Sequence, residues 1–382
     1  MKSNQLAAAV CAVLLLSACS NSNLPQTPAS TSSVTVTQAP AVTTAGTVTT
    51  EAVTTEADSP YLSAEEMCAQ IRDAVADFRF TFTVKGEIDA GLIDPAFQLL
   101  YQNYPEYFWV RNYNYSQTAP DTLQISLAKF ENYSAEKIAA LSGELTAAAN
   151  AVAAQIPAGA DDYQKALFVH DYIVTHTAYD SASAEAQNYH YAVCHTAYGS
   201  LVKGSAVCEG YSRAFQYIMK LLGIECGTVS GMAGQERHAW NYIKLDGDYY
   251  WLDATWDDPS NPDRPDANAL SHAYFLLNDS YMSRSHTLDP DNLFVPECSS
   301  MKLNYFAVNG RLFDSYDFEV FDSKLNAAET EFMFTTDEAY SQAIKALFDD
   351  GEIWNAAFLE GKSPSISYIK QDYISVFSLN IT

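Results

Sequence analysis

Residues 204–256 decide the fold, and they read Gly-Ser-Ala-Val-Cys-Glu-Gly-Tyr at 204–211, His-Ala-Trp-Asn at 238–241 and Asp-Ala-Thr-Trp at 253–256. These segments supply a thiol at Cys208, an imidazole at His238 and a carboxylate at Asp253, in that order. Cysteine catalysis needs these three groups, because a thiolate attacks, a histidine carries the proton and an acid group orients the ring. The three residues are therefore a candidate catalytic set.

Cys208 is predicted to lie at the start of a helix. The apolar residues Phe215, Ile218 and Leu222 recur with helical spacing, and Gly223 follows as a stop signal. The positive end of a helix dipole and its unpaired backbone N–H groups favour a thiolate over a thiol. A single cysteine is more often a small buried apolar residue, so Cys208 alone does not establish catalysis.

The Asp-Gly pair at 246–247 is a strong signal for a two-residue hairpin turn. It predicts that the residues on either side of the turn pair with each other, joining 238–245 to 248–253. In this register His238 and Asp253 are diagonal neighbours on one face, with about 7–8 Å between their backbones. A bulge at the turn would shift the register and separate the two side chains.

These motifs resemble the core of the transglutaminase-like superfamily, which has a papain-like architecture. The resemblance covers about 161–259 and is carried by Cys208, His238–Asn241 and Asp253–Trp256. Surface proteins of Gram-positive anaerobes that contain Cys-Glu-Gly-Tyr are especially similar. The resemblance implies an α+β fold in which the cysteine helix packs on an antiparallel sheet. The family includes cross-linking acyltransferases, peptidases, deglycosylating amidases and inactive members, so it predicts a thiol site more firmly than a reaction.

The N-terminal region is predicted to export and anchor the protein. Residues 1–18 are typical of a signal peptide, because the apolar run at 6–16 is too short to span a bilayer. The Leu-Ser-Ala-Cys sequence ending at Cys19 resembles a bacterial lipoprotein cleavage box. We therefore expect a lipid on Cys19 and a folded part outside the cell; an ordinary signal peptide is the alternative. Residues 19–59, rich in Ser, Thr and Pro, are predicted to form a disordered tether.

Three folded units are expected after the tether. They are an N-terminal α/β unit at 60–157, the transglutaminase-like core at 158–300 and a C-terminal α/β satellite unit at 301–382. Both flanking units show the order strand, helix, strand, strand, at 80–130 and 331–379. We therefore predict that two small modules of one topology flank the core.

The composition limits the partners of the protein. The 382-residue chain has a formal charge of −26 and is 48% hydrophobic, which permits a large core and argues against binding nucleic acid or anionic lipid headgroups. We expect a protein or peptide substrate, with the membrane contacted only through the N-terminal lipid. The sequence leaves the oligomeric state undecided. It also leaves open whether four cysteines form two disulfides or none: Cys68, Cys194, Cys226 and Cys298.

No cofactor and no metal site is predicted. His190, Cys194 and His195 are close in sequence, but no second closely spaced pair of ligands accompanies them as in a zinc site. The acidic residues at 257–266 lack the spacing of an EF-hand, so we interpret them as a solvated loop. The other histidines are assigned no catalytic role: His170 and His176, interpreted as packing or surface residues, and His286.

The predicted reaction is attack of the Cys208 thiolate on a carboxamide. His238 holds the thiol proton and then gives it to the leaving amine, Asp253 orients the imidazole, and the Cys208 backbone N–H is an expected oxyanion donor. Hydrolysis, as in a peptidase or amidase, is favoured over transfer to a lysine amine, as in a cross-linking transglutaminase. The alternative from another class is a non-catalytic surface binding module. For that alternative we expect Cys208 to be buried or out of reach of its partners.

Overall fold

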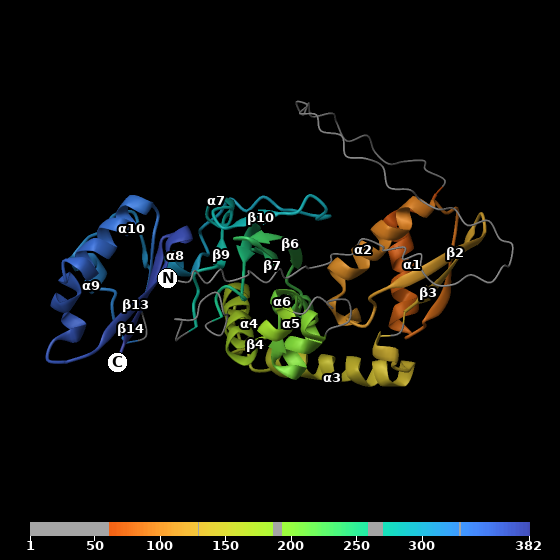
Figure 1. The fold of residues 1–382 in the computed structure, drawn as a ribbon, viewed down its shortest axis with the longest axis horizontal. Helices are drawn as coiled ribbons and strands as arrows, with labels where there is room; N and C mark the ends of the chain where they lie inside the picture. The colour runs from red at the N-terminus through yellow and green to blue at the C-terminus, as the bar shows by residue number, and fades with distance from the viewer. Residues whose placement is uncertain (1–60, 129, 186–192, 259–269, 328–329) are drawn as a thin grey trace, which may run out of the picture.

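The structure is a computed structural model that describes residues 61–128, 130–185, 193–258, 270–327 and 330–382. In Figure 1 a central unit of helices and sheet lies between an N-terminal unit at one end and a C-terminal unit at the other. Several of the residues and segments predicted above lie outside the described residues: the signal peptide, Cys19, the tether, His190, Asp263 and Asp266. Within the described ranges, no helix is long and apolar enough to cross a membrane.

The central unit is built around helix α6 (Cys208–Leu221) and a five-stranded sheet of order β10-β6-β7-β8-β9. The strand pairs of this sheet are all antiparallel. This is the α+β core expected from the sequence, with a cysteine at the start of a helix that packs on an antiparallel sheet. The strands are β6 (Cys226–Ala233), β7 (Glu236–Leu245), β8 (Asp248–Leu252), β9 (Phe275–Leu277) and β10 (His286–Leu288).

The predicted hairpin between β7 and β8 is confirmed. Leu245 pairs with Asp248, and the register continues without a bulge to Asn241 opposite Leu252. The turn residues Asp246 and Gly247 have φ angles of 51° and 91°. Two successive left-handed residues are typical of a type I′ turn, whose twist matches that of the two strands. The turn therefore sets which side chains of the hairpin share a face.

Three strands of each flanking unit share one order, as predicted, in which the third strand along the chain lies between the first and the second. In the N-terminal unit, β1 (Thr81–Lys85) and β2 (Tyr113–Ala119) lie on either side of β3 (Thr122–Leu127), antiparallel to it. In the C-terminal unit, β12 and β13 lie on either side of β14 in the same way, and β11 adds a parallel pair to β12. The strands of the C-terminal unit are β11 (Leu312–Phe313), β12 (Glu331–Phe334), β13 (Ile366–Gln371) and β14 (Val376–Ile381).

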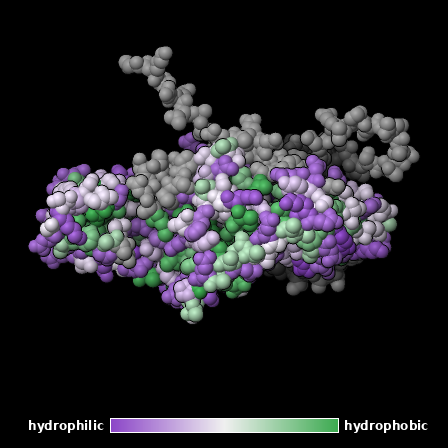
Figure 2. All heavy atoms as spheres, turned by 90° about the horizontal axis from the view of Figure 1, so that it is seen from below, coloured by the Kyte–Doolittle hydropathy of each residue, from purple (hydrophilic) through white to green (hydrophobic). Residues whose placement is uncertain are grey.

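Helices cover these sheets and surround α6. The longer ones are α1 (Ala64–Ala76), α2 (Ile93–Asn103), α3 (Ala135–Ala153), α4 (Asp162–His176) and α10 (Asp337–Ile344). Shorter elements are β4 (Ala178–Tyr179), α5 (Ser181–Glu185), β5 (Ser205–Ala206), α7 (Asp279–Met282), α8 (Tyr305–Val308) and α9 (Phe318–Asp322). Figure 2 shows hydrophilic side chains over much of both ends of the molecule, with apolar ones visible near the middle and on part of the end at the left of the view.

Helix α6 is buried from Cys208 to Met219, including its polar residues. These residues bond to neighbouring parts of the chain: Arg213 Nη1 donates to the carbonyl of Tyr101 at 2.5 Å, and Gln216 Nε2 donates to the carbonyl of Gln102 at 2.5 Å. Both carbonyls belong to α2, so the polar face of α6 docks the N-terminal unit on the core. A buried polar group without such a partner costs about 1–3 kcal/mol.

Glu209 joins a buried charge cluster at the first turn of α6. Its carboxylate is 2.7 Å from Arg213 Nε, 3.2 Å from His195 Nδ1 and 3.9 Å from Arg111 Nη1. Burial acts to raise the pKa of Glu209, but the charge of Arg213, the hydrogen bond from His195 and the charge of Arg111 together hold this pKa well below its usual range. The cluster therefore keeps a carboxylate ionised next to Cys208.

Gly210 is required by the close approach of α6 to the segment before it. A Cβ at this position would lie 2.3 Å from the carbonyl oxygen of Cys194 and 2.7 Å from the Ala206 methyl group. We predict that Gly210→Ala lowers the free energy of unfolding by about 1–3 kcal/mol, because the backbone must shift. Gly143→Ala in α3 is the matched control. Its Cβ meets nothing within 4 Å, so it should raise stability by about 0.5–1 kcal/mol. Chemical denaturation of both variants measures this, and equal effects would contradict the packing argument.

Replacement of Glu209 tests the buried charge cluster. Glu209→Gln leaves Arg213 without its carboxylate and should cost about 3–5 kcal/mol of unfolding free energy near neutral pH. Because the folded pKa is depressed, the stabilisation is present above the unfolded pKa of about 4.3 and is lost as the pH falls below it. The difference between wild type and variant should therefore stay constant above about pH 5 and shrink steadily from about pH 5 to about pH 3. Urea titrations across this range measure it, and a constant difference would contradict the assignment.

Candidate active site

Cys208 is the first residue of α6, as the sequence predicts. The residue before it, Val207, has an extended backbone and provides no side-chain cap, so the positive end of the helix dipole meets the thiol rather than a capping oxygen. The Cys208 side chain is fully buried and packs against Ala239 of β7. The Ser212 hydroxyl donates to the Ala239 carbonyl at 2.9 Å and so fixes the helix against this strand.

His238 and Asp253 are brought into direct contact by the hairpin. His238 lies on β7, and Asp253 follows directly after β8. His238 Nε2 is 2.7 Å from Asp253 Oδ2, and both side chains are buried. Strand β7 carries both His238 and Ala239, and Ala239 packs against Cys208. The strand that holds the imidazole is therefore the strand that contacts the cysteine. Because Nε2 is bound to the carboxylate, Nδ1 is the ring nitrogen available to exchange a proton elsewhere.

The Asp-Ala-Thr-Trp segment holds the Asp253 carboxylate in place. Oδ1 accepts backbone N–H groups from Thr255 at 2.9 Å and from Trp256 at 3.2 Å, which leaves Oδ2 for His238. Burial acts to raise the pKa of Asp253, but the charge and hydrogen bond of His238, with a second histidine at Oδ2, hold it well below its usual range. Asp253 is therefore a carboxylate that accepts hydrogen bonds and does not itself carry the proton.

That second histidine is His286, which the sequence reasoning missed. His286 Nε2 lies 3.1 Å from Asp253 Oδ2, and its Nδ1 lies 2.8 Å from the Ser285 hydroxyl. Burial lowers the pKa of His286, which favours a neutral ring that donates one N–H to the carboxylate. The residue comes from β10, the strand that pairs with β6 at the edge of the sheet. Its position reflects long-range strand pairing, for which the local sequence carries no signal.

Asp257 and Asp258, which follow Asp253 closely, are interpreted from the sequence as part of a solvated loop. For these two residues the interpretation is wrong. Both are almost completely buried. Asp257 accepts the Tyr274 backbone N–H at 3.1 Å and lies 3.2 Å from His170 Nε2. Asp258 contacts the hydroxyl of Tyr211, the tyrosine of the Cys-Glu-Gly-Tyr motif. The two carboxylates therefore tie the end of the hairpin to helices α4 and α6.

The sequence leaves open whether the cysteines form disulfides. In the described ranges they are thiols rather than disulfides. They are Cys68, Cys194, Cys208, Cys226 and Cys298. Burial raises the pKa of Cys226 well above its usual value and raises that of Cys68 to about 11. These two thiols are therefore poor nucleophiles near neutral pH.

Comparison with known proteins adds a family to this geometry. Residues 150–255 match the sequence profile described as "Transglutaminase-like superfamily". This range contains Cys208, His238 and Asp253. Among curated proteins, the kyphoscoliosis peptidase of Homo sapiens is 33% identical over a segment that covers 13% of this chain and 9% of the relative, and that of Mus musculus is 31% identical with the same coverage. The matched segment thus spans about a tenth of the length of these relatives.

Two solved structures show a weaker similarity. One is described as "Crystal structure of a TGase" and is 17% identical, with 46% of this chain and 50% of that chain covered at a TM-score of 0.29. The other is a putative cysteine protease from Cytophaga hutchinsonii, 19% identical, with coverages of 37% and 53% and a TM-score of 0.25. The family assignment rests on the sequence profile and its motifs: residues 150–255 of this chain form a transglutaminase-like domain.

Proposed function

We propose that this protein is an exported thiol enzyme that cleaves amide bonds in proteins or peptides through Cys208, His238 and Asp253. The observation that carries the proposal is the 2.7 Å contact between His238 Nε2 and Asp253 Oδ2, on a hairpin whose first strand packs against the cysteine. A carboxylate that binds one ring nitrogen fixes the tautomer in which the other nitrogen accepts a proton. The transglutaminase-like profile over the same residues supports this assignment.

In the proposed reaction, the Cys208 thiol gives its proton to Nδ1 of His238, and the sulfur attacks the carbonyl carbon of the substrate amide. The backbone N–H of Cys208 donates to the oxyanion that forms. The tetrahedral intermediate collapses as His238 gives the proton to the leaving amine, which produces a thioester. Water, deprotonated by His238, then attacks the thioester, so that a carboxylic acid and the free thiol are released. Asp253 remains ionised throughout and stabilises the imidazolium.

Hydrolysis is the outcome that we favour, with transfer to a lysine amine as its close variant. The mammalian relatives that match this chain carry the name of a peptidase, although the match covers only a small part of each. Transfer and hydrolysis share the same thioester and differ only in the nucleophile that attacks it. An assay that follows both released carboxylate and incorporated amine therefore distinguishes them.

A non-catalytic surface binding module is the second candidate, and the burial of Cys208 is the observation that favours it. The side chain has no exposed surface, so an amide reaches the sulfur only if neighbouring residues move. The contact between His238 and Asp253 favours the enzyme, because a binding module does not need an imidazole that is oriented by a carboxylate. Measurement of thiol reactivity decides between the two candidates.

The proposed location follows from the sequence. A lipid on Cys19 would hold the protein to the bacterial membrane, and residues 19–59 would extend the folded part away from it. A chain with a net charge of −26 is unsuited to nucleic acid or to anionic headgroups. We therefore propose extracellular proteins or peptides as substrates, with the lipid as the only contact to the membrane.

Labelling with a thiol-reactive amide tests Cys208 as the nucleophile. Iodoacetamide at neutral pH should modify Cys208 faster than Cys226, whose thiol is raised in pKa by burial. Peptide mapping by mass spectrometry measures both rates in one sample. The Cys208→Ser variant should lose the fast adduct and reduce amide hydrolysis by at least about a thousandfold, while Cys226→Ser should change neither. Equal slow labelling of both cysteines at every pH would support the binding module instead.

Variants of the shared carboxylate test the roles of Asp253 and His286. Asp253→Asn should lower kcat by about 10³–10⁴-fold, because the amide no longer fixes the tautomer of His238. His286→Ala should lower kcat by about tenfold, because it removes one N–H donor from Asp253, and His286→Gln should restore part of the rate. Steady-state kinetics on a peptide substrate measures these effects. An unchanged rate in Asp253→Asn, or a failure of glutamine to exceed alanine at 286, would contradict the assigned roles.

A further inference from the structure

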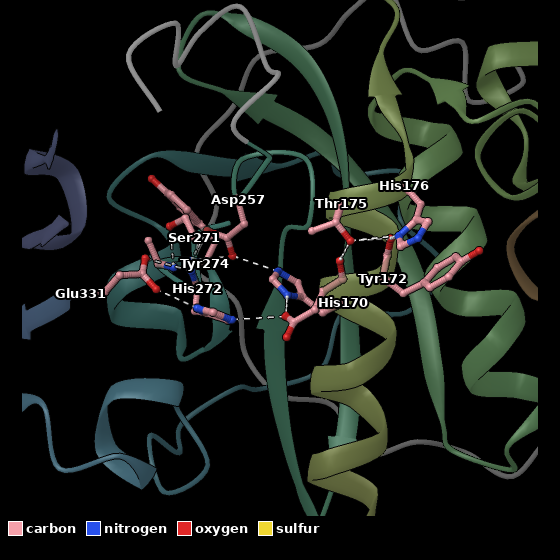
Figure 3. Close-up of polar contacts among 11 residues, drawn as sticks. His170, Tyr172, Thr175, His176, Asp257, Ser271, His272, Tyr274 and Glu331 are labelled. Atoms are coloured by element: carbon pink, nitrogen blue, oxygen red, sulfur yellow. Dashed lines mark hydrogen bonds and ion pairs between the residues drawn. The ribbon is translucent and has the colours of Figure 1, made fainter. Parts of the chain in front are cut away.

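A second cluster of histidines and carboxylates, made of residues other than the proposed triad, lies between α4, the segment before β9 and strand β12 (Figure 3). Asp171 Oδ1 lies 2.9 Å from His170 Nδ1 and 3.2 Å from His272 Nε2. The three atoms that these residues offer all lie within 4.8 Å of one another. His170 is fully buried and His272 nearly so. Two imidazole nitrogens and a carboxylate oxygen therefore converge on one point.

The outer nitrogen of each ring is held by another carboxylate. His170 Nε2 lies 3.2 Å from Asp257 Oδ2, and His272 Nδ1 lies 2.7 Å from Glu331 Oε2. Glu331 also accepts the backbone N–H of His272 at 3.2 Å, so its orientation is fixed. Figure 3 shows Asp257 and Glu331 reaching the two rings from different segments of the chain. Histidines that bind metals characteristically donate their other N–H to a carboxylate in this way.

The two rings, when neutral, offer fewer N–H groups than the carboxylates around them can accept, and this shortage indicates that the cluster needs further positive charge. A neutral imidazole has a single N–H, yet both nitrogens of His170 and both nitrogens of His272 face carboxylate oxygens. If His170 Nε2 and His272 Nδ1 carry the protons, then the lone pairs of His170 Nδ1 and His272 Nε2 point at Oδ1 of Asp171. The cluster is then satisfied either by a second proton on each ring or by one divalent cation among the inner atoms. The cation replaces two protons without changing the net charge.

We propose that His170 Nδ1, Asp171 Oδ1 and His272 Nε2 bind one Zn²⁺ ion. Zinc takes imidazole and carboxylate ligands at about 2.0–2.2 Å in a tetrahedral arrangement. Such bonds place ligand atoms about 3.3–3.5 Å apart. The separations of 2.9 and 3.2 Å from Asp171 Oδ1 must therefore expand slightly, and the two ring nitrogens, which lie within 4.8 Å of each other, must come to the same spacing. The Asp171 side chain is 35% exposed, which gives the ion a path from solvent and leaves the fourth position for water.

The ion would join parts of the chain that are distant in sequence. His170 and Asp171 belong to α4, whereas His272 lies before β9 and is held by Glu331 of β12 in the C-terminal unit. Tyr305 stacks on the ring of His272 with centroids 3.8 Å apart. Zinc bound here stabilises the docking of the C-terminal unit on the core, and it takes no part in the proposed amide cleavage.

Zinc binding to the full chain, freed of metal with a chelator, tests the proposal. Elemental analysis after dialysis against Zn²⁺ should find one equivalent per chain. Anomalous scattering at the zinc edge should place it between His170, Asp171 and His272. The Asp171→Asn variant should weaken the affinity by at least a hundredfold. His176→Asn is the matched control, since it is a histidine of the same helix that bonds within the helix, and it should change the affinity by less than twofold.

Two further measurements distinguish zinc at this cluster from zinc bound elsewhere on the chain. Glu331→Gln keeps the shape of the side chain and should weaken zinc binding by about 10–100-fold, because it disturbs the partner of a ligand. A chelator should lower the Tm of wild type but leave that of Asp171→Asn unchanged, which shows that the variant is folded and lacks the ion. Absence of zinc from wild type, equal binding by wild type and Asp171→Asn, or loss of zinc only in Asp253→Asn, which would place the ion in the active site, would each overturn the proposal.

Discussion

From Cys208 to Met219, helix α6 is buried although it carries charged and polar residues, and its neighbours are arranged so that these groups find partners. Glu209 meets two arginines and a histidine, Arg213 and Gln216 reach the carbonyls of α2, and Ser212 reaches β7. An unpaired group at any of these positions costs about 1–3 kcal/mol. The N-terminal unit and the sheet are therefore fixed around α6, and Cys208 at its first turn has a defined position.

The hairpin provides the second part of this arrangement. Its type I′ turn sets the register, the register puts His238 beside Asp253, and two backbone N–H groups orient the carboxylate towards the ring. No long-range search of conformations is needed to form this contact, because the two residues are only 15 positions apart. The contact that the proposed chemistry needs most is thus the one that local structure makes most reliable, and α6 only has to dock against it.

This difference between local and long-range structure explains which features the sequence could predict. The helix start at Cys208, the hairpin register and the topology shared by the flanking units follow from spacing, turn residues and the order of elements. His286 could not be found in this way, because it reaches Asp253 through an edge strand 33 residues further along the chain. The contact of His170 with Asp257 spans 87 residues. Asp257 is therefore interpreted from the sequence as part of a solvated loop, because the sequence gives no sign of a partner so distant along the chain.

The two His-Asp-His clusters of the described chain have the same composition but differ in the charge around their rings. In the candidate active site, one carboxylate serves both rings, and its second oxygen is occupied by backbone N–H groups. The remaining nitrogen of His286 meets the hydroxyl of Ser285, so a neutral ring is satisfied. In the proposed reaction, Nδ1 of His238 is then the nitrogen that transfers the proton. In the other cluster three carboxylates surround two rings, and neutral rings are not satisfied without a cation. An excess of carboxylates over rings therefore separates a cluster suited to holding a metal from one suited to moving a proton.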